Sequence, residues 1–209
     1  MSGPAACDNG PERGLGAPAR ICRACHTRPV KFTRRTAPGS MERLSLLAAL
    51  RAAGCVRCRR VDTVVGHGHL QGDSCSGPRG LRLLCSDRYS NCGCGRTFSV
   101  HWDDVIPGAS LAAAQLLMLI RALAAAPSRH AAWSATRLSI SLTGAYRWFA
   151  RWARFTISIK TWLCTVCHPP GKSDALPDPH NLRHLDAAFS ACPCPAAAFQ
   201  NRFQVALAT

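Results

Sequence analysis

Two cysteine motifs in the first half of the chain constrain its fold more than any other feature. Residues 55–58 read Cys-Val-Arg-Cys, and Cys85, Cys92 and Cys94 follow after a gap. A Cys-x-x-Cys turn brings two thiolates together, and a structural zinc site usually takes its four ligands from two separated pairs. The first pair is clear, whereas the second pair has to come from three candidates. Metal binding would also fold a segment that is too short to bury a useful core of its own.

The stretch between the two motifs has the composition of short β-strands. Aliphatic and β-branched residues mix with arginines over residues 60–65 and 81–84. This pattern predicts a small stack of β-hairpins held by metal, which is a zinc ribbon. Leucines at helical spacing and a glycine stop over residues 41–54 predict a short helix that covers one side of the ribbon.

The second motif carries a family resemblance. Cys85-Ser-Asp-Arg and the later Gly-Cys-Gly-Arg-Thr-Phe-Ser run, which contains Cys94, resemble the zinc ribbon at the front of bacterial transposases and transposase-like proteins. The similarity is to a poorly characterised bacterial group with a long second knuckle, and it covers roughly residues 41–205. It implies that Cys55, Cys58, Cys85 and Cys94 bind a structural Zn²⁺ and that Cys92 is an additional thiol. The eight-residue gap between Cys85 and Cys94 departs from the ordinary spacing, so Cys92 and Cys94 remain in competition.

Three helices are predicted after the ribbon. The first covers residues 111–125, capped by Ser110 and ended by Pro127, and the second covers 129–138 after Ser128. The third runs from residue 142 to about 155, and we favour its continuation through the ambiguous segment that follows. Two short helices joined by a tight turn match the helix-turn-helix pattern, and the start of the third helix resembles the recognition helix of transposase-type modules.

Seven residues of this region are candidate DNA contacts: Arg137, Ser141, Thr143, Tyr146, Arg147, Arg151 and Arg154. One side of a helix is shared by four of them: Thr143, Arg147, Arg151 and Arg154. Of these, Arg147 and Arg151 would reach base edges or phosphates. We expect the opposite, packed side to come from Tyr146, Phe149, Ala150 and Ala153. The alternative is an amphipathic helix whose arginines are only solvated.

The charge balance favours a polyanionic partner. The chain has 26 Lys and Arg residues against 11 Asp and Glu residues, a formal net charge of +15, and residues 105–172 contain no acid at all. Arginine binds phosphate and guanine well. A GC-rich genome would explain the abundant alanine but not the missing acids.

Other cysteines and histidines admit several readings. Cys22, Cys25 and His26 form half of a metal site or a chance cluster. Residues 164–168 match the attachment pattern of c-type haem, which requires export, or form a second zinc half-site that Cys192 and Cys194 would complete. Chance is again the alternative. His67 and His69 alternate along a hairpin, and we expect them to be exposed rather than metal ligands.

The expected fold class is α+β, mostly α, with a small zinc-ribbon β-hairpin module followed by a helical helix-turn-helix region. We expect a disordered basic arm at residues 1–40, the ribbon with its leading helix at 41–106, the helix-turn-helix region at 107–168, and a linker with a final helix (179–190) at 169–209. No secretory signal or membrane span is evident, so a cytoplasmic, nucleoid-associated bacterial protein is expected.

The expected function is DNA binding by a protein that resembles the N-terminal part of transposases and lacks a recognisable catalytic domain. Its partners would be double-stranded DNA and a transposase or a second copy of the chain. A complete but divergent transposase or nuclease is one alternative, and it needs about three carboxylates around two Mg²⁺ ions. The acids after the ribbon show no such pattern, so catalysis is not expected: Asp103, Asp104, Asp174, Asp178 and Asp186. A ribbon that binds only other proteins is the other alternative.

Overall fold

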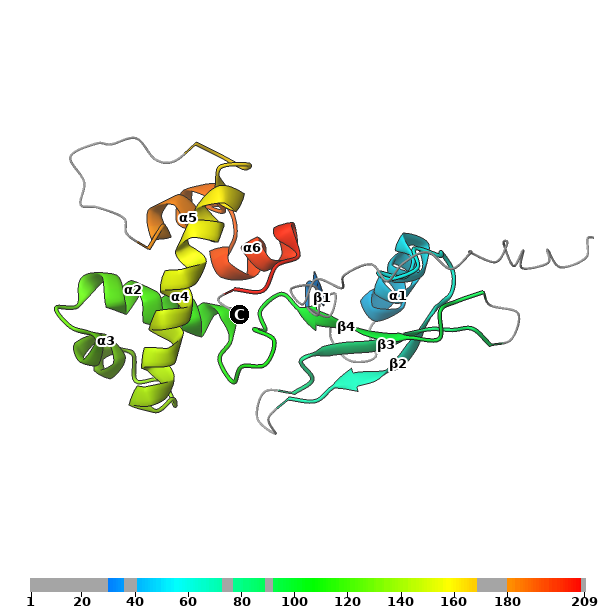
Figure 1. Ribbon diagram of the computed structural model, residues 1–209, viewed down its shortest axis with the longest axis horizontal. Helices are drawn as coiled ribbons and strands as arrows, with labels where there is room; N and C mark the ends of the chain where they lie inside the picture. Colours follow the sequence, from blue (N-terminus) through cyan, green and yellow to red (C-terminus); the bar gives the residue numbers. More distant parts are fainter. Residues whose placement is uncertain (1–29, 36–40, 73–76, 89–91, 169–179, 208–209) are drawn as a thin grey trace, which may run out of the picture.

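The computed structural model describes residues 30–35, 41–72, 77–88, 92–168 and 180–207. Within these residues the chain is an α+β protein with a four-stranded mixed sheet and six helices. In chain order the elements are β1 (Val30–Thr33), α1 (Met41–Ala53), β2 (Val64–Leu70), β3 (Gly80–Cys85), β4 (Thr97–Trp102), α2 (Ala113–Ala125), α3 (Arg129–Thr136), α4 (Leu142–Leu163), α5 (Leu182–Ala188) and α6 (Pro195–Phe203). Helices α2 to α6 gather beside the sheet, whereas α1 covers one of its faces (Figure 1).

The sheet has the strand order β1-β4-β3-β2. The pairs β2–β3 and β3–β4 are antiparallel, and β1 runs parallel to β4. Side chains alternate in β3 and β4, so that Leu81, Leu83, Phe98 and Val100 are buried in a core that also contains Leu50 of α1. The predicted helix over residues 41–54 is therefore confirmed, and the alternation leaves the opposite face of the sheet open.

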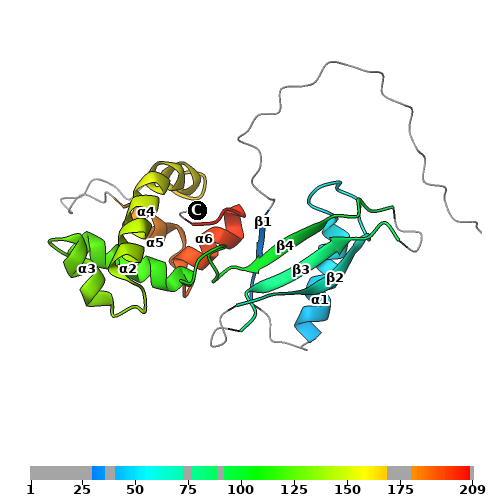
Figure 2. The same cartoon turned by 60° about the horizontal axis from the view of Figure 1, so that its bottom comes forward.

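The strand β1 corrects the prediction that residues 1–40 are disordered. Residues 30–33 pair with residues 99–102 of β4, and Phe32 is buried. A four-residue strand has too little periodicity to stand out in a sequence, and its partner is far away along the chain. Cys22, Cys25 and His26 lie outside the described residues. In Figure 2 β1 lies next to β4 on the side of the sheet that faces α6.

The helical part has its own core, separate from that of the sheet. Residues from α2, α4, α5 and α6 meet there, including the fully buried Leu116, Trp152, Ile159 and Phe199. Helix α4 continues to Leu163, which confirms the favoured reading of that ambiguous segment. Among the described helices, none is long and apolar enough to cross a lipid bilayer.

The N-termini of α2 and α3 are capped in different ways. Ser128 caps α3 as predicted, because its Oγ accepts a hydrogen bond from the Ala131 N–H at 3.1 Å. The predicted Ser110 cap of α2 is wrong, because this helix begins at Ala113 and the side chain of Gln115 accepts from the Ala112 N–H at 2.9 Å. Gln at this position can satisfy a free N–H group in place of a capping hydroxyl.

The C-terminal region contains two helices instead of the single predicted one. The described part of the first, α5, is shorter than the predicted helix over residues 179–190, and α6 follows a proline-rich stretch that we did not predict as helical. Pro195 occupies the first turn of α6, where proline is well tolerated. Phe199 and Phe203 of α6 contact each other at a ring-centroid distance of 4.8 Å and pack on the helical core.

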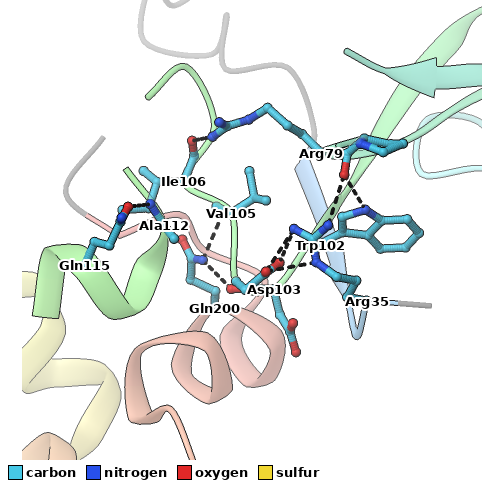
Figure 3. A network of polar contacts seen from close by, with 11 residues as sticks. Arg35, Arg79, Trp102, Asp103, Val105, Ile106, Ala112, Gln115 and Gln200 are labelled. Atoms are coloured by element: carbon cyan, nitrogen blue, oxygen red, sulfur yellow. Dashed lines mark hydrogen bonds and ion pairs between the residues drawn. The ribbon is translucent and has the colours of Figure 1, made fainter. Parts of the chain in front are cut away.

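Polar contacts join the helical part to the sheet at the end of β4 (Figure 3). The fully buried Gln200 donates from Nε2 to the carbonyl oxygens of Asp103 (2.7 Å) and Val105 (3.1 Å). Its Oε1 accepts from the Leu207 N–H at 3.0 Å. Both acids at this junction have partners: the Asp104 carboxylate pairs with the Arg35 guanidinium at 2.9 Å, and Asp103 accepts from an asparagine of α6.

Gln204 makes a second junction of this kind. Its Oε1 accepts from the N–H of Phe32 at 2.8 Å, and its Nε2 donates to the carbonyl of Phe32 at 3.1 Å. The side-chain amide thus occupies the place that a neighbouring strand would take beside β1. The segment that follows α6 is thereby hydrogen-bonded to β1.

We expect the substitution Gln200→Met to lower the free energy of unfolding by about 2 kcal/mol. Methionine has a similar volume but leaves two buried carbonyls and one N–H without a partner. Urea unfolding would measure the change, and Gln71→Met at an exposed position is the control. Equal stability of the two variants would contradict the structural role of Gln200.

Candidate metal centre

Four cysteine side chains converge at one end of the sheet. Cys55 and Cys58 follow α1, Cys85 ends β3, and Cys94 precedes β4. The four Sγ atoms all lie within 4.8 Å of one another, with 3.9 Å between Cys55 and Cys94 and 3.6 Å between Cys58 and Cys85. A tetrahedral site with metal–sulfur bonds of about 2.3 Å has sulfur–sulfur distances of about 3.8 Å. The four cysteines can therefore hold a metal ion.

The first pair sits in a tight turn that follows α1 directly. Gly54 ends the helix with φ +77°, and an added Cβ would lie 2.9 Å from the Arg59 carbonyl oxygen. The Arg57 N–H then donates to the Cys55 sulfur at 3.3 Å, and the Arg59 N–H donates to the Cys55 carbonyl at 2.9 Å. The first of these bonds orients the Cys55 sulfur, and the second closes the backbone turn around it.

The second pair forms a similar turn in spite of its long sequence gap. The Cys94 N–H donates to the Cys85 sulfur at 3.2 Å, and the Gly93 N–H donates to the Ser86 carbonyl at 2.9 Å. Ser86 and Gly93 therefore lie side by side, although six residues separate them in the sequence. The arrangement is a two-residue knuckle with an insertion in its middle. Cys94, and not Cys92, joins the four-cysteine group, and Cys92 is disulfide-bonded, which corrects the expectation that it is an additional thiol.

Gly93 is what allows this closed turn. A Cβ on Gly93 would lie 2.0 Å from the Ser86 carbonyl oxygen, which is far inside van der Waals contact. Its φ is not in the left-handed region, so the requirement for glycine is one of space and not of backbone conformation. Only a glycine lets the chain on both sides of the insertion approach this closely.

The thiols differ in how readily they ionise. The Arg60 backbone N–H lowers the pKa of Cys58 to about 7, whereas burial raises the pKa of Cys85 to about 12 against the opposing hydrogen bond of Thr63. The Thr63 Oγ1 lies 3.2 Å from the Cys85 sulfur. A cation at the centre would supply the charge that stabilises the Cys85 thiolate.

No second metal group forms among the described residues. Cys164, Cys167, Cys192 and Cys194 are present as free thiols, but no three of them converge with each other or with a histidine or an acid. The second half-site that the sequence left open as one alternative is therefore not assembled in the described part of the chain. His67 and His69 are exposed on β2, as expected.

The predicted DNA-contact residues lie in the connection between α3 and α4 and along the first part of α4. Arg137 adopts φ +50° directly after α3, and Ser141 caps α4 by accepting from the Gly144 N–H at 3.1 Å. Four side chains of α4 are exposed along one side, as the helical spacing predicts: Thr143, Arg147, Arg151 and Arg154. The Arg129 guanidinium lies 5.9 Å from the ring centre of Tyr146, which is 38% exposed.

The packed side of α4 was predicted only in part. Phe149 is buried as expected, but Tyr146, Ala150 and Ala153 are exposed. The buried side is formed instead by Ala145, Trp148, Phe149, Trp152, Ile159 and Leu163. The tryptophans bury more apolar surface than the alanines would, so the side of α4 that carries the tryptophans faces the core. Arg151 lies over the edge of this side, 5.0 Å from the ring centre of Trp148.

Comparison with known proteins found no relative of this chain. No family model matches the chain, and neither does any curated protein or solved structure. A functional assignment therefore depends on the geometry and charge of the chain itself.

Sequence reasoning missed Thr63 as a partner of Cys85, whereas the basic hairpin between the two cysteine motifs was expected to bind duplex DNA together with the third helix. Thr63 lies eight positions after Cys55 and carries no motif, and only the fold brings its hydroxyl to Cys85. Arg82 belongs to that basic hairpin, and as the charged residue of an otherwise apolar strand it points away from the core.

Proposed function

We propose that this chain is a zinc-dependent DNA-binding protein. Cys55, Cys58, Cys85 and Cys94 hold a structural Zn²⁺ in a zinc ribbon, and α3 and α4 form a helix-turn-helix that enters the major groove. The observation that carries the proposal is the exposed arginine side of α4, which follows a short capped helix within the acid-free stretch 105–172. As the resemblance to transposase-like proteins implies, a transposase or a second copy would be the protein partner in a bacterial nucleoid.

The four-cysteine donor set supports zinc as the metal. Soft thiolates select zinc or iron–sulfur clusters, and a tetrahedral site with four protein ligands leaves no open position for catalysis. The spacing of the sulfurs fits a single ion, because all four lie within 4.8 Å of one another. Two knuckles on either side of the β2–β3 hairpin are typical of a zinc ribbon.

Close packing of α3 and α4 supports the helix-turn-helix. Ala132 and Ala145 are fully buried in the helical core, and such small residues allow two helices to approach closely. The Trp133 Nε1 donates to the Ile140 carbonyl at 2.9 Å and fixes the connection between the helices. The N-terminal half of α4 then presents Thr143 and Arg147 to solvent, where the second helix of such a module contacts base edges.

We expect Arg147→Ala to weaken binding to a duplex selected from a random pool by roughly 1–3 kcal/mol and to relax its sequence preference. Fluorescence anisotropy titrations with the selected duplex and a scrambled duplex would measure both effects. Arg121→Ala is the matched control, because Arg121 is exposed on α2 and pairs with Asp186 at 2.7 Å. If the wild-type, metal-loaded protein ignores duplex DNA at low salt, the proposed function is wrong.

A further inference from the structure

The open face of the sheet contains a basic groove next to the metal centre. The groove has a volume of about 640 Å³ and is lined by three arginines together with hydroxyl groups of β4: Arg57, Arg82, Arg96, Thr97 and Ser99. All three arginines are exposed. Arg82 on β3 lies directly opposite Ser99 on β4, so the two side chains share this face.

The charge of the groove is positive throughout its described lining. No carboxylate lines it, and even when Asp87, which approaches Gly95, is counted, the net charge stays positive. Guanidinium groups bind phosphate oxygens through two parallel hydrogen bonds, and nearby hydroxyls can donate to the same oxygens. None of the three arginines belongs to the predicted DNA-contact residues of α4.

The metal centre sets the positions of two of these arginines. Arg57 lies inside the first knuckle, and its N–H donates to the Cys55 sulfur at 3.3 Å. Arg96 follows the second knuckle, and its carbonyl accepts from the Cys85 N–H at 2.9 Å. Since both knuckles end on the same four sulfurs, the convergence of the cysteines places Arg57 and Arg96 at the groove.

We propose that this groove binds the phosphodiester backbone of nucleic acid and that the metal assembles it. The inference rests on the proposed DNA-binding function and deepens it, because it assigns the backbone contact to the sheet and leaves base contacts to α4. Arg57, Arg82 and Arg96 neutralise phosphates without regard to sequence. The two surfaces therefore contribute separately to affinity and to specificity.

The test compares two triple variants with the same net charge. One carries Arg57→Gln, Arg82→Gln and Arg96→Gln, and the control carries Arg43→Gln, Arg121→Gln and Arg202→Gln, outside the groove lining. We expect the groove variant to lose affinity equally for selected and scrambled duplexes. The slope of log Kobs against log salt concentration should fall by roughly 2 to 3 in magnitude, since each phosphate contact contributes about 0.9. The control should change it by less than about 1.

Each outcome separates the groove from the proposed function. The groove assignment is overturned if the groove variant binds duplex DNA with an unchanged salt slope, or if the control variant shows the same change in slope. Either result leaves the proposed DNA binding in place. Poly-glutamate of matched charge that competes as well as DNA overturns the assignment to phosphate. Failure of the wild-type protein to bind any duplex overturns both. Metal content measured on the groove variant establishes that its knuckles are intact.

Discussion

Removal of the metal, or the substitution Cys85→Ser, is expected to unfold the sheet and leave the helical core folded. The residues buried around β3 and β4 form a small core that includes Cys55 and Cys85 themselves, while α2 and α4 pack in a separate one. A segment of this size has little apolar surface to bury. Structural Zn²⁺ contributes about 10–16 kcal/mol of apparent binding free energy in isolated zinc fingers, which exceeds the stability of most small domains.

Hydrogen exchange would measure this outcome segment by segment. Amides of β3 and β4 should lose protection when a chelator is added, whereas amides of α2 and α4 should keep theirs. Cys164→Ser is the matched control, because Cys164 is exposed and lies outside the four-cysteine group. Protection of β3 that survives chelation would show that the cysteines are not a structural metal site.

The substitution Gly93→Ala is expected to reduce metal affinity by on the order of 100-fold, the upper end of the effects seen when residues that support metal ligands are changed. The added methyl group would lie 2.0 Å from the Ser86 carbonyl oxygen, so the two halves of the knuckle have to separate. Separation breaks the hydrogen bond from the Gly93 N–H to Ser86 and withdraws the Cys94 N–H from the Cys85 sulfur.

A competition titration with a chromophoric chelator would measure the affinity. Gly66→Ala is the control, since Gly66 is a strand residue without positive φ and an added Cβ there meets no atom within 4 Å. Unchanged affinity in Gly93→Ala would mean that the insertion is not closed by the contact between Ser86 and Gly93.

Short-range sequence patterns predicted several features of this fold. The helix at residues 41–53, the cap at Ser128 and the exposed arginine side of α4 follow from short-range spacing, which the sequence displays directly. The convergence of four cysteines was also anticipated, although the family resemblance supplied the choice of Cys94 over Cys92. Such features need no knowledge of distant residues.

The features that were missed depend on contacts between distant parts of the chain. β1 is recognisable only beside β4, and α6 only because Phe199 completes the helical core. The knuckle insertion was hidden because Ser86 and Gly93 are neighbours in space and not in sequence. The packed side of α4 was misjudged because the core, and not the helix alone, decides which aromatic residues are buried.

The amide of Gln204 has a consequence for how copies of this protein meet. A sheet edge with open N–H and carbonyl groups invites a strand from another molecule and so promotes self-association. Here the side chain satisfies both backbone groups of Phe32 on the outermost strand. Gln204, directly after α6, therefore blocks the pairing of a further strand at Phe32 on this edge of the sheet, whereas β2 forms the opposite edge.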